Sequence, residues 1–144
     1  MPAIETTALT KRYGETVAVD ALDLTVPEGV VYGFLGPNGA GKTTTMRMFT
    51  SLTRPTSGSA SVAGVPVTER ERLIQRVGYL PEEPPLYNEL TAREQLTYVA
   101  GLRDLPSDRT EERIEEMLTR LDLADDADRR IDTYSKGMRQ KTAF

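Results

Sequence analysis

The sequence predicts an α/β fold in which a glycine-rich loop joins a buried strand to a helix. Three consecutive segments indicate this. Residues 30–35 form a short apolar run, typical of a parallel strand buried on both faces. Residues 36–43 contain three glycines. Residues 43–52 contain neither glycine nor proline, so a helix is expected there.

The glycine-rich segment reads Gly-Pro-Asn-Gly-Ala-Gly-Lys-Thr and matches the pattern G-x-x-x-x-G-K-[ST] at every fixed position. Its glycines allow the backbone to approach a phosphate closely, with N–H groups directed at it from the positive end of the next helix. Lys42 supplies a cation for the β- and γ-phosphates, and the Thr43 hydroxyl is placed to ligate Mg²⁺. The pattern predicts a nucleoside triphosphate site comprising Gly36, Pro37, Asn38, Gly39, Ala40, Gly41, Lys42, Thr43 and Thr44. The alternative is a glycine-rich turn without a ligand.

The composition limits the other possibilities. The 144 residues carry a formal net charge of −4, which argues against a nucleic-acid surface. The absence of cysteine excludes disulfides, thiolate metal sites and thiol catalysis, and the absence of histidine excludes a histidine base. The N-terminus shows no secretory pattern, and no apolar run is long enough to span a membrane.

The other elements of the first 90 residues follow from alternation and turn residues. A turn at residues 13–15 separates the first two predicted strands, and Pro81-Glu82-Glu83-Pro84-Pro85 is expected to be an extended loop. The predicted elements are strands over 4–9, 17–26, 59–63 and 77–80, the last of them buried, and a short helix over 69–76.

The following part of the chain is predicted to be helical. Thr91-Ala92-Arg93-Glu94 is a capping box that begins one helix, with Leu96, Val99 and Ala100 on a shared face. Ser107 begins a second helix, and residues 122–128 are expected to be a solvated acidic connection. The second helix carries a narrow apolar stripe, which predicts a core contact, made of Ile114, Met117, Leu118 and Leu121.

Three further segments occur in a characteristic order around the loop: Lys11-Arg12-Tyr13-Gly14, Pro81-Glu82, and residues 134–140, Tyr-Ser-Lys-Gly-Met-Arg-Gln. With them the chain resembles the ATP-binding cassette of ABC transporters, from its N-terminus to just past the family's signature motif. The resemblance implies a P-loop NTPase (RecA-like) core with an N-terminal antiparallel β-subdomain and a helical subdomain. The expected organisation is one partial domain, 1–144, with the β-subdomain and core over 1–90 and the helical subdomain over 91–144.

The resemblance also implies roles for these segments. Tyr13 corresponds to the aromatic residue that stacks on adenine; the alternative is a tyrosine packed at a strand end. Glu82 takes the place of the Q-loop glutamine, where its carboxylate could ligate Mg²⁺ together with Thr43. The alternative for Glu82 and Glu83 is that both are solvated loop acids.

Residues 134–140 resemble the signature L-S-G-G-Q, in which Lys136 replaces the first glycine and Met138 the glutamine. The resemblance implies that Ser135, Lys136, Gly137 and Met138 contact the ATP held by an opposite subunit. The alternative is a plain serine N-cap.

The function implied is that of an ATP-binding subunit, with ATP and Mg²⁺ as cofactors, that couples ATP binding and hydrolysis to transport. The implied partners are a membrane-spanning permease and a second cassette but no nucleic acid, and the implied location is peripheral, on the cytoplasmic face of the cell membrane. The residue sequences of these motifs are most similar to those of exporters, including multidrug-type systems.

The family's Walker B Asp, its catalytic Glu and its switch His have no counterpart in these 144 residues, so the sequence identifies no catalytic base and is expected to be truncated. The alternative function is therefore a truncated nucleotide-binding module without ATP turnover. A soluble ABC protein that acts on ribosomes or DNA is less consistent with the excess of acidic over basic residues. No N-K-x-D motif indicates a GTPase.

Overall fold

A computed structural model describes residues 1–144, and the chain divides into two compact units. The N-terminal unit comprises Met1–Tyr79, and the C-terminal unit comprises Leu80–Phe144. Each unit has a hydrophobic core of its own. The subdivision expected from the sequence, between residues 90 and 91, stays a prediction.

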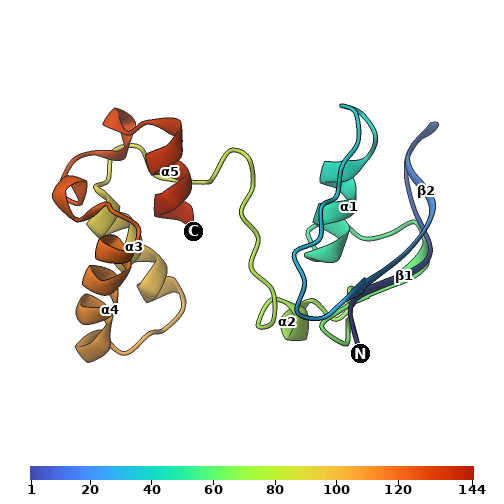
Figure 1. The fold of residues 1–144 in the computed structure, drawn as a ribbon, viewed down its shortest axis with the longest axis horizontal. Coiled ribbons are helices and arrows are strands. Elements are labelled where there is room, and N and C mark those ends of the chain that lie inside the picture. The colour runs from blue at the N-terminus through green and yellow to red at the C-terminus, as the bar shows by residue number, and fades with distance from the viewer. The chain divides into compact units, whose positions relative to one another are not determined.

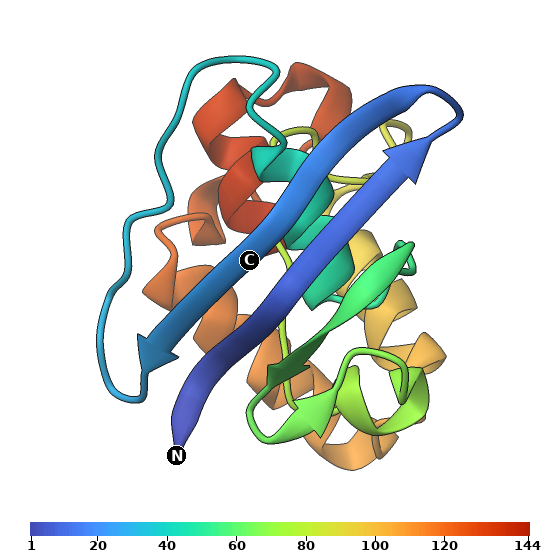
Figure 2. The same ribbon diagram turned by 90° about the vertical axis from the view of Figure 1, so that its right-hand side faces the viewer.

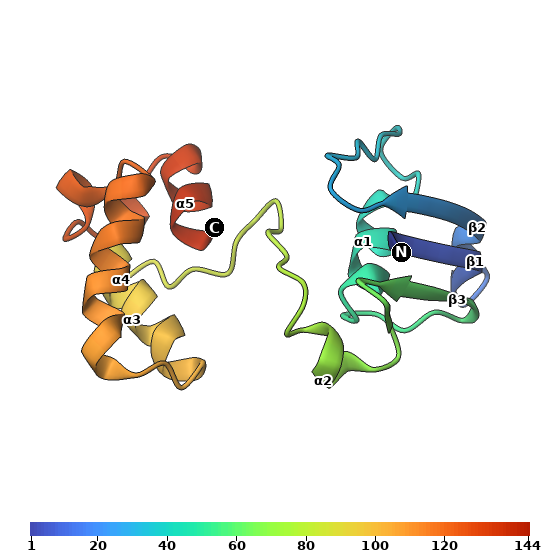
Figure 3. The ribbon, with the colours of Figure 1, turned by 60° about the horizontal axis from the view of Figure 1, so that its bottom comes forward.

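The N-terminal unit is built on an antiparallel sheet with the strand order β2-β1-β3-β4. The long strands β1 (Pro2–Tyr13) and β2 (Thr16–Pro27) form a hairpin, and β3 (Ser57–Val62) pairs with the other edge of β1 (Figure 3). The strands predicted over 4–9, 17–26 and 59–63 are thus confirmed. The remaining elements are β4 (Val65–Pro66) and the one-turn helix α2 (Arg70–Leu73), shorter than predicted.

Helix α1 (Lys42–Phe49) covers one face of this sheet, as Figure 2 shows. Met48 and Phe49, on the sheet-facing side of α1, are buried against Leu9 of β1 and Val19 of β2. This packing fixes the start of α1, where the phosphate-loop motif ends, relative to the β1–β2 hairpin. The helix predicted over 43–52 is confirmed, with its last turn shorter than expected.

Two sequence predictions are wrong: residues 30–35 and 77–80 are not strands in this structure. Both segments are largely exposed, and Val31 has its whole side chain in solvent. A buried parallel strand requires hydrogen-bonded neighbours on both sides. The only sheet present is antiparallel, and neither segment pairs with it. Apolar composition alone therefore did not decide the conformation.

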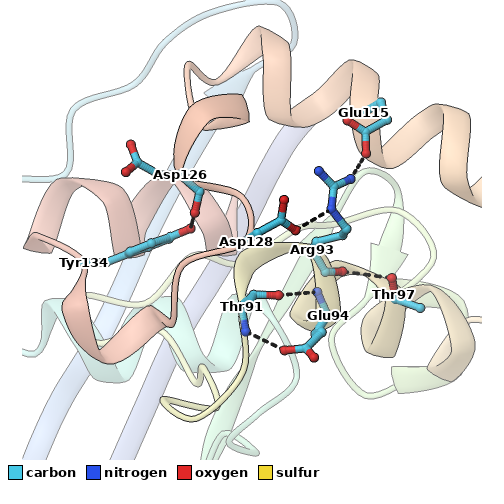
Figure 4. Close-up of polar contacts among 8 residues, drawn as sticks. All are labelled: Thr91, Arg93, Glu94, Thr97, Glu115, Asp126, Asp128 and Tyr134. Atoms are coloured by element: carbon cyan, nitrogen blue, oxygen red, sulfur yellow. Dashed lines mark hydrogen bonds and ion pairs between the residues drawn. The ribbon is translucent and has the colours of Figure 1, made fainter.

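The C-terminal unit is helical (Figure 1). Helices α3 (Ala92–Leu102) and α4 (Ser107–Arg120) pack against each other, and α5 (Lys136–Ala143) follows two 3₁₀ turns, η1 (Ala124–Asp126) and η2 (Ile131–Thr133). The predicted capping box is confirmed. The Thr91 hydroxyl accepts the N–H of Glu94 at 3.1 Å, and the Glu94 carboxylate accepts the N–H of Thr91 at 2.8 Å (Figure 4).

The core of the C-terminal unit confirms the apolar stripe of α4, since Ile114 and Leu118 are buried. Two details differ from the predictions. Val99 is exposed, because α3 buries the face that carries Ala92 and Ala100 instead. The acidic segment 122–128 is not merely a solvated connection: it folds into η1, with Leu123 and Ala127 buried on either side.

Arg93 of α3 joins three parts of the C-terminal unit (Figure 4). Its guanidinium forms ion pairs with Glu115 of α4 and with Asp128, the latter at 2.9 Å. These ion pairs are largely exposed, so they orient the helices more than they stabilise them. None of the helices in the structure is both long enough and apolar enough to span a bilayer.

Candidate phosphate-binding loop and signature segment

The phosphate loop begins after the exposed segment 30–35 and ends at the first residue of α1. Gly39 and Gly41 both have φ near +86°, a left-handed conformation that favours glycine. Gly36, the first glycine of the motif, does not have a positive φ. Its missing side chain matters for space instead, because a Cβ there would lie 3.3 Å from the Cβ of Ala40.

Gly41 is the position of this loop where glycine is most strictly required. A Cβ added at Gly41 would lie 2.2 Å from the carbonyl oxygen of Ala18 in β2, far closer than a non-bonded Cβ approaches another atom. The close approach lets the loop turn against the β1–β2 hairpin and enter α1 directly. Gly41 is also the N-cap residue of α1, and no side chain caps that end. The first N–H groups of α1 are therefore left for another acceptor, as an anion site requires.

The Lys42 side chain folds back over the loop. Its ammonium group donates hydrogen bonds to the carbonyl oxygens of Gly36 at 2.6 Å and Pro37 at 2.7 Å. The cation therefore lies beside the loop backbone, at the end of α1 where the partial positive charge of the helix is concentrated. Thr43 and Thr44 follow in the first turn, with the Thr43 side chain exposed. The residues present thus fit a phosphate group: free N–H donors, a cation and an exposed hydroxyl.

Tyr13 ends β1 in the same unit, with half of its surface exposed. It lies outside the core, and both the stacking on adenine and the alternative of a tyrosine packed at a strand end stay predictions. The ammonium group of Lys11 lies 5.0 Å from the centre of its ring. Sequence reasoning missed this contact, although two residues that are two positions apart on a strand share one side of it.

The signature segment lies in the C-terminal unit, where Ser135 is the N-cap of α5. Its hydroxyl accepts the N–H of Met138 at 3.2 Å, so the predicted serine N-cap is confirmed. Lys136 and Gly137 are exposed in the first turn of α5. Whether these residues also contact the ATP of another subunit stays a prediction.

Glu82 also lies in the C-terminal unit, whereas Thr43 lies in the N-terminal unit. The Glu82 carboxylate is almost fully exposed and lies 3.7 Å from the Lys136 ammonium group. The structure contains no cluster of three or more histidine, cysteine or acidic side chains that could hold a metal ion. The magnesium site of Thr43 and Glu82 stays a prediction.

Two contacts that the sequence did not predict connect the Glu82 segment to α5. The Gln140 amide donates to the carbonyl oxygen of Glu82 at 2.6 Å, and the Arg139 guanidinium donates to the Asn88 side chain at 2.7 Å. The residues where the Q-loop is expected are therefore held by the helix that begins at the signature segment. No local pattern signals such contacts, because more than 50 residues separate the partners.

The strand hairpin, the glycine loop and the uncapped helix together define a nucleotide-binding protein of the P-loop class. The family model described as "ABC transporter" matches residues 19–144. This chain belongs to the ABC transporter family, as the resemblance implied.

Individual relatives agree with this assignment. The chain is 44% identical to the daunorubicin/doxorubicin resistance ATP-binding protein DrrA of Streptomyces peucetius, over 96% of this chain and 42% of that protein. It is 39% identical to the bacitracin transport ATP-binding protein BcrA of Bacillus licheniformis, over 96% of this chain and 44% of that protein. The chain thus spans less than half the length of these relatives.

Solved structures confirm the fold class. An ATP-binding subunit of an ABC transporter superposes with a TM-score of 0.81 at 30% identity, over 98% of this chain and 59% of that chain. CbiO1 of Clostridium perfringens, described as part of the ABC transporter complex cbiONQ, superposes with a TM-score of 0.84 at 22% identity, over 99% of this chain and 59% of that one.

Proposed function

We propose that this chain is the nucleotide-binding part of an ABC transporter subunit that couples ATP binding and hydrolysis to export. The observation that carries the proposal is the phosphate loop, in which Gly39 and Gly41 are left-handed and α1 begins without a side-chain cap. The similarity to a daunorubicin/doxorubicin resistance and a bacitracin transport ATP-binding protein supports export over import.

Each residue of the site has a distinct task in this proposal. The first N–H groups of α1 and the Lys42 ammonium group hold the β- and γ-phosphates. The exposed face of Tyr13 stacks on adenine. The Thr43 hydroxyl, with Glu82, would ligate Mg²⁺, which neutralises phosphate charge when bound. Ser135, Lys136, Gly137 and Met138 would contact the nucleotide of a second cassette.

The proposed partners are that second cassette and a membrane-spanning permease, with the subunit peripheral to the membrane on its cytoplasmic side. A surface on the C-terminal unit supports a permease contact. Tyr87, Tyr98 and Leu102 are exposed on and beside α3, and the two tyrosine rings meet edge to face at 5.3 Å. A shallow groove lined by Leu90, Tyr98 and Leu102 adjoins them. Exposed apolar side chains gathered at a groove favour a protein partner.

The proposed phosphate site is tested by replacing Lys42 with alanine and titrating the variant with Mg²⁺–ATP in a calorimeter. Loss of a charge-assisted contact costs about 1.5–3 kcal/mol, so the Kd should rise by roughly ten- to a hundredfold. Lys141→Ala, which removes an exposed lysine of α5, is the matched control and should bind ATP normally. Unchanged affinity in the folded Lys42 variant would reject the proposed site.

A second candidate function is nucleotide binding without turnover, because no catalytic base is identified among these 144 residues. The two functions differ in whether bound ATP is hydrolysed, so measuring phosphate release distinguishes them.

A further inference from the structure

Lys11 and Tyr13 lie two positions apart at the end of β1, beside the hairpin turn, where the pairing register of β1 and β2 shifts. The Lys11 ammonium group is 5.0 Å from the centre of the Tyr13 ring, within the range of a cation–π contact. Tyr13 is nevertheless 50% exposed. The cation thus lies over one face of the ring, while half of the surface of Tyr13 stays accessible to solvent.

The ammonium group is itself held in place by a second contact. It donates a hydrogen bond of 2.8 Å to the carbonyl oxygen of Arg54, which lies in the loop between α1 and β3. Two neighbouring contacts reinforce this connection. Thr56 donates its N–H to the Thr10 carbonyl at 2.8 Å, and the Arg12 N–H donates to the Thr56 hydroxyl at 3.0 Å. Lys11 is thus fixed over the ring rather than free to move through solvent.

This arrangement has a consequence for a planar ligand. An exposed tyrosine without neighbours would sample several rotamers, and a stacking base would have to immobilise it at an entropic cost. A cation held over one face of the ring favours a single orientation of the ring. It also leaves only the opposite face for a base. The second face is also made electron-poorer by the cation, which suits an electron-rich purine ring.

We propose that Lys11 is a positioning residue for nucleotide recognition: it orients the Tyr13 ring and leaves a single face for the adenine base. The inference rests on the proposed function, because it assumes that Tyr13 stacks on the base. It goes beyond that function by assigning a role to a residue outside the phosphate loop.

The test measures the Kd of the full chain for Mg²⁺–ATP and for inorganic tripolyphosphate, which has phosphates but no base. Lys11→Gln removes the charge but keeps a hydrogen-bond donor, and Lys11→Arg keeps the charge. We expect Lys11→Gln to weaken ATP binding about two- to fivefold, to leave tripolyphosphate binding unchanged, and Lys11→Arg to bind ATP normally. Circular dichroism verifies that each variant is folded, and Lys11→Met replaces Lys11→Gln if the latter is not.

A second background separates positioning from a merely structural role. In the Tyr13→Leu protein, which lacks the ring, Lys11→Gln should have no additional effect on ATP binding. If Lys11→Gln weakens ATP binding as much in the Tyr13→Leu protein as in the wild type, Lys11 does not act through the ring. If it weakens tripolyphosphate binding as much as ATP binding, Lys11 acts on the phosphate site. Either result would overturn the inference. If Tyr13→Leu itself leaves ATP affinity unchanged, base stacking is rejected. If only Lys11→Gln is without effect, the stacking stands and the positioning role alone fails.

Discussion

At the scale of single residues, Gly41 lies closer to the rest of the N-terminal unit than the other two glycines of the phosphate loop. Its φ is +86°, and a side chain would meet the Ala18 carbonyl oxygen at 2.2 Å. Two independent restrictions, conformation and space, therefore apply to one position. Because Gly41 is also the N-cap of α1, a shift of its backbone would displace the N–H groups that we propose bind the phosphates.

Replacing Gly41 with alanine should both destabilise the N-terminal unit and weaken ATP binding. The left-handed conformation alone costs about 1–2 kcal/mol for a residue with a Cβ, and the clash adds to that. Urea unfolding and calorimetric titration with Mg²⁺–ATP measure the two effects. Gly33→Ala is the matched control, since Gly33 has neither a positive φ nor a neighbour within 4 Å. Wild-type stability in Gly41→Ala would contradict the loop geometry described above.

At the scale of elements, Tyr134 joins the two 3₁₀ turns that precede α5. Its side chain is buried, and its hydroxyl donates to the Asp126 carbonyl at the end of η1 (Figure 4). Burial, reinforced by the nearby Asp126 carboxylate, raises the pKa of Tyr134 above its ordinary value of 10.0. The connection between η1 and α5 is therefore built to hold a neutral tyrosine.

This raised pKa predicts a loss of stability at alkaline pH. Below pH 10 Tyr134 is neutral in both the folded and unfolded states, and its contribution is complete; above it, the unfolded chain ionises first. The free energy of unfolding should therefore fall as the pH rises from 10 through the folded-state pKa. Tyr134→Phe should reduce this fall, while costing about 1 kcal/mol at pH 7 for the lost hydrogen bond. Urea unfolding at several pH values tests both, and an identical alkaline fall in the variant would assign it to other tyrosines.

At the scale of the whole molecule, the proposed site residues are divided between the two units. The phosphate loop and Tyr13 belong to the N-terminal unit, whereas Glu82 and the signature segment belong to the C-terminal unit. The matched relatives are more than twice as long as the part this chain spans. The proposed phosphate contacts therefore come from one unit, and the proposed signature contacts come from the other.

Phosphate release distinguishes the two candidate functions. We expect this chain to bind Mg²⁺–ATP without measurable release of phosphate, and to gain turnover when joined to the part of DrrA that follows the matched region. Lys42→Ala in the extended protein is the control and should abolish the activity. Measurable phosphate release by this chain without the extension would exclude the binding-only function. An extended protein that is folded and dimeric but inactive would identify Glu82 as disabling, and Glu82→Gln should then restore turnover.

Local patterns predicted much of this structure. The hairpin of β1 and β2, helix α1, the capping box of Thr91 and Glu94, and the Ser135 N-cap all depend on residues close in sequence. Burial was predicted less well, as the exposed segment 30–35 shows. A run of apolar residues favours burial, but only neighbouring strands can provide it.

The sequence by itself determined the phosphate-loop motif, the capping box, the Ser135 N-cap and the family, because each is encoded by residue types at fixed short spacings. The tertiary structure decided which surfaces those residues meet. The contact of Gly41 with Ala18, the Lys11 cation over Tyr13 and the bond from Gln140 to Glu82 belong to this second group. The positions of these partners depend on sheet pairing and helix packing, which no short window of sequence contains.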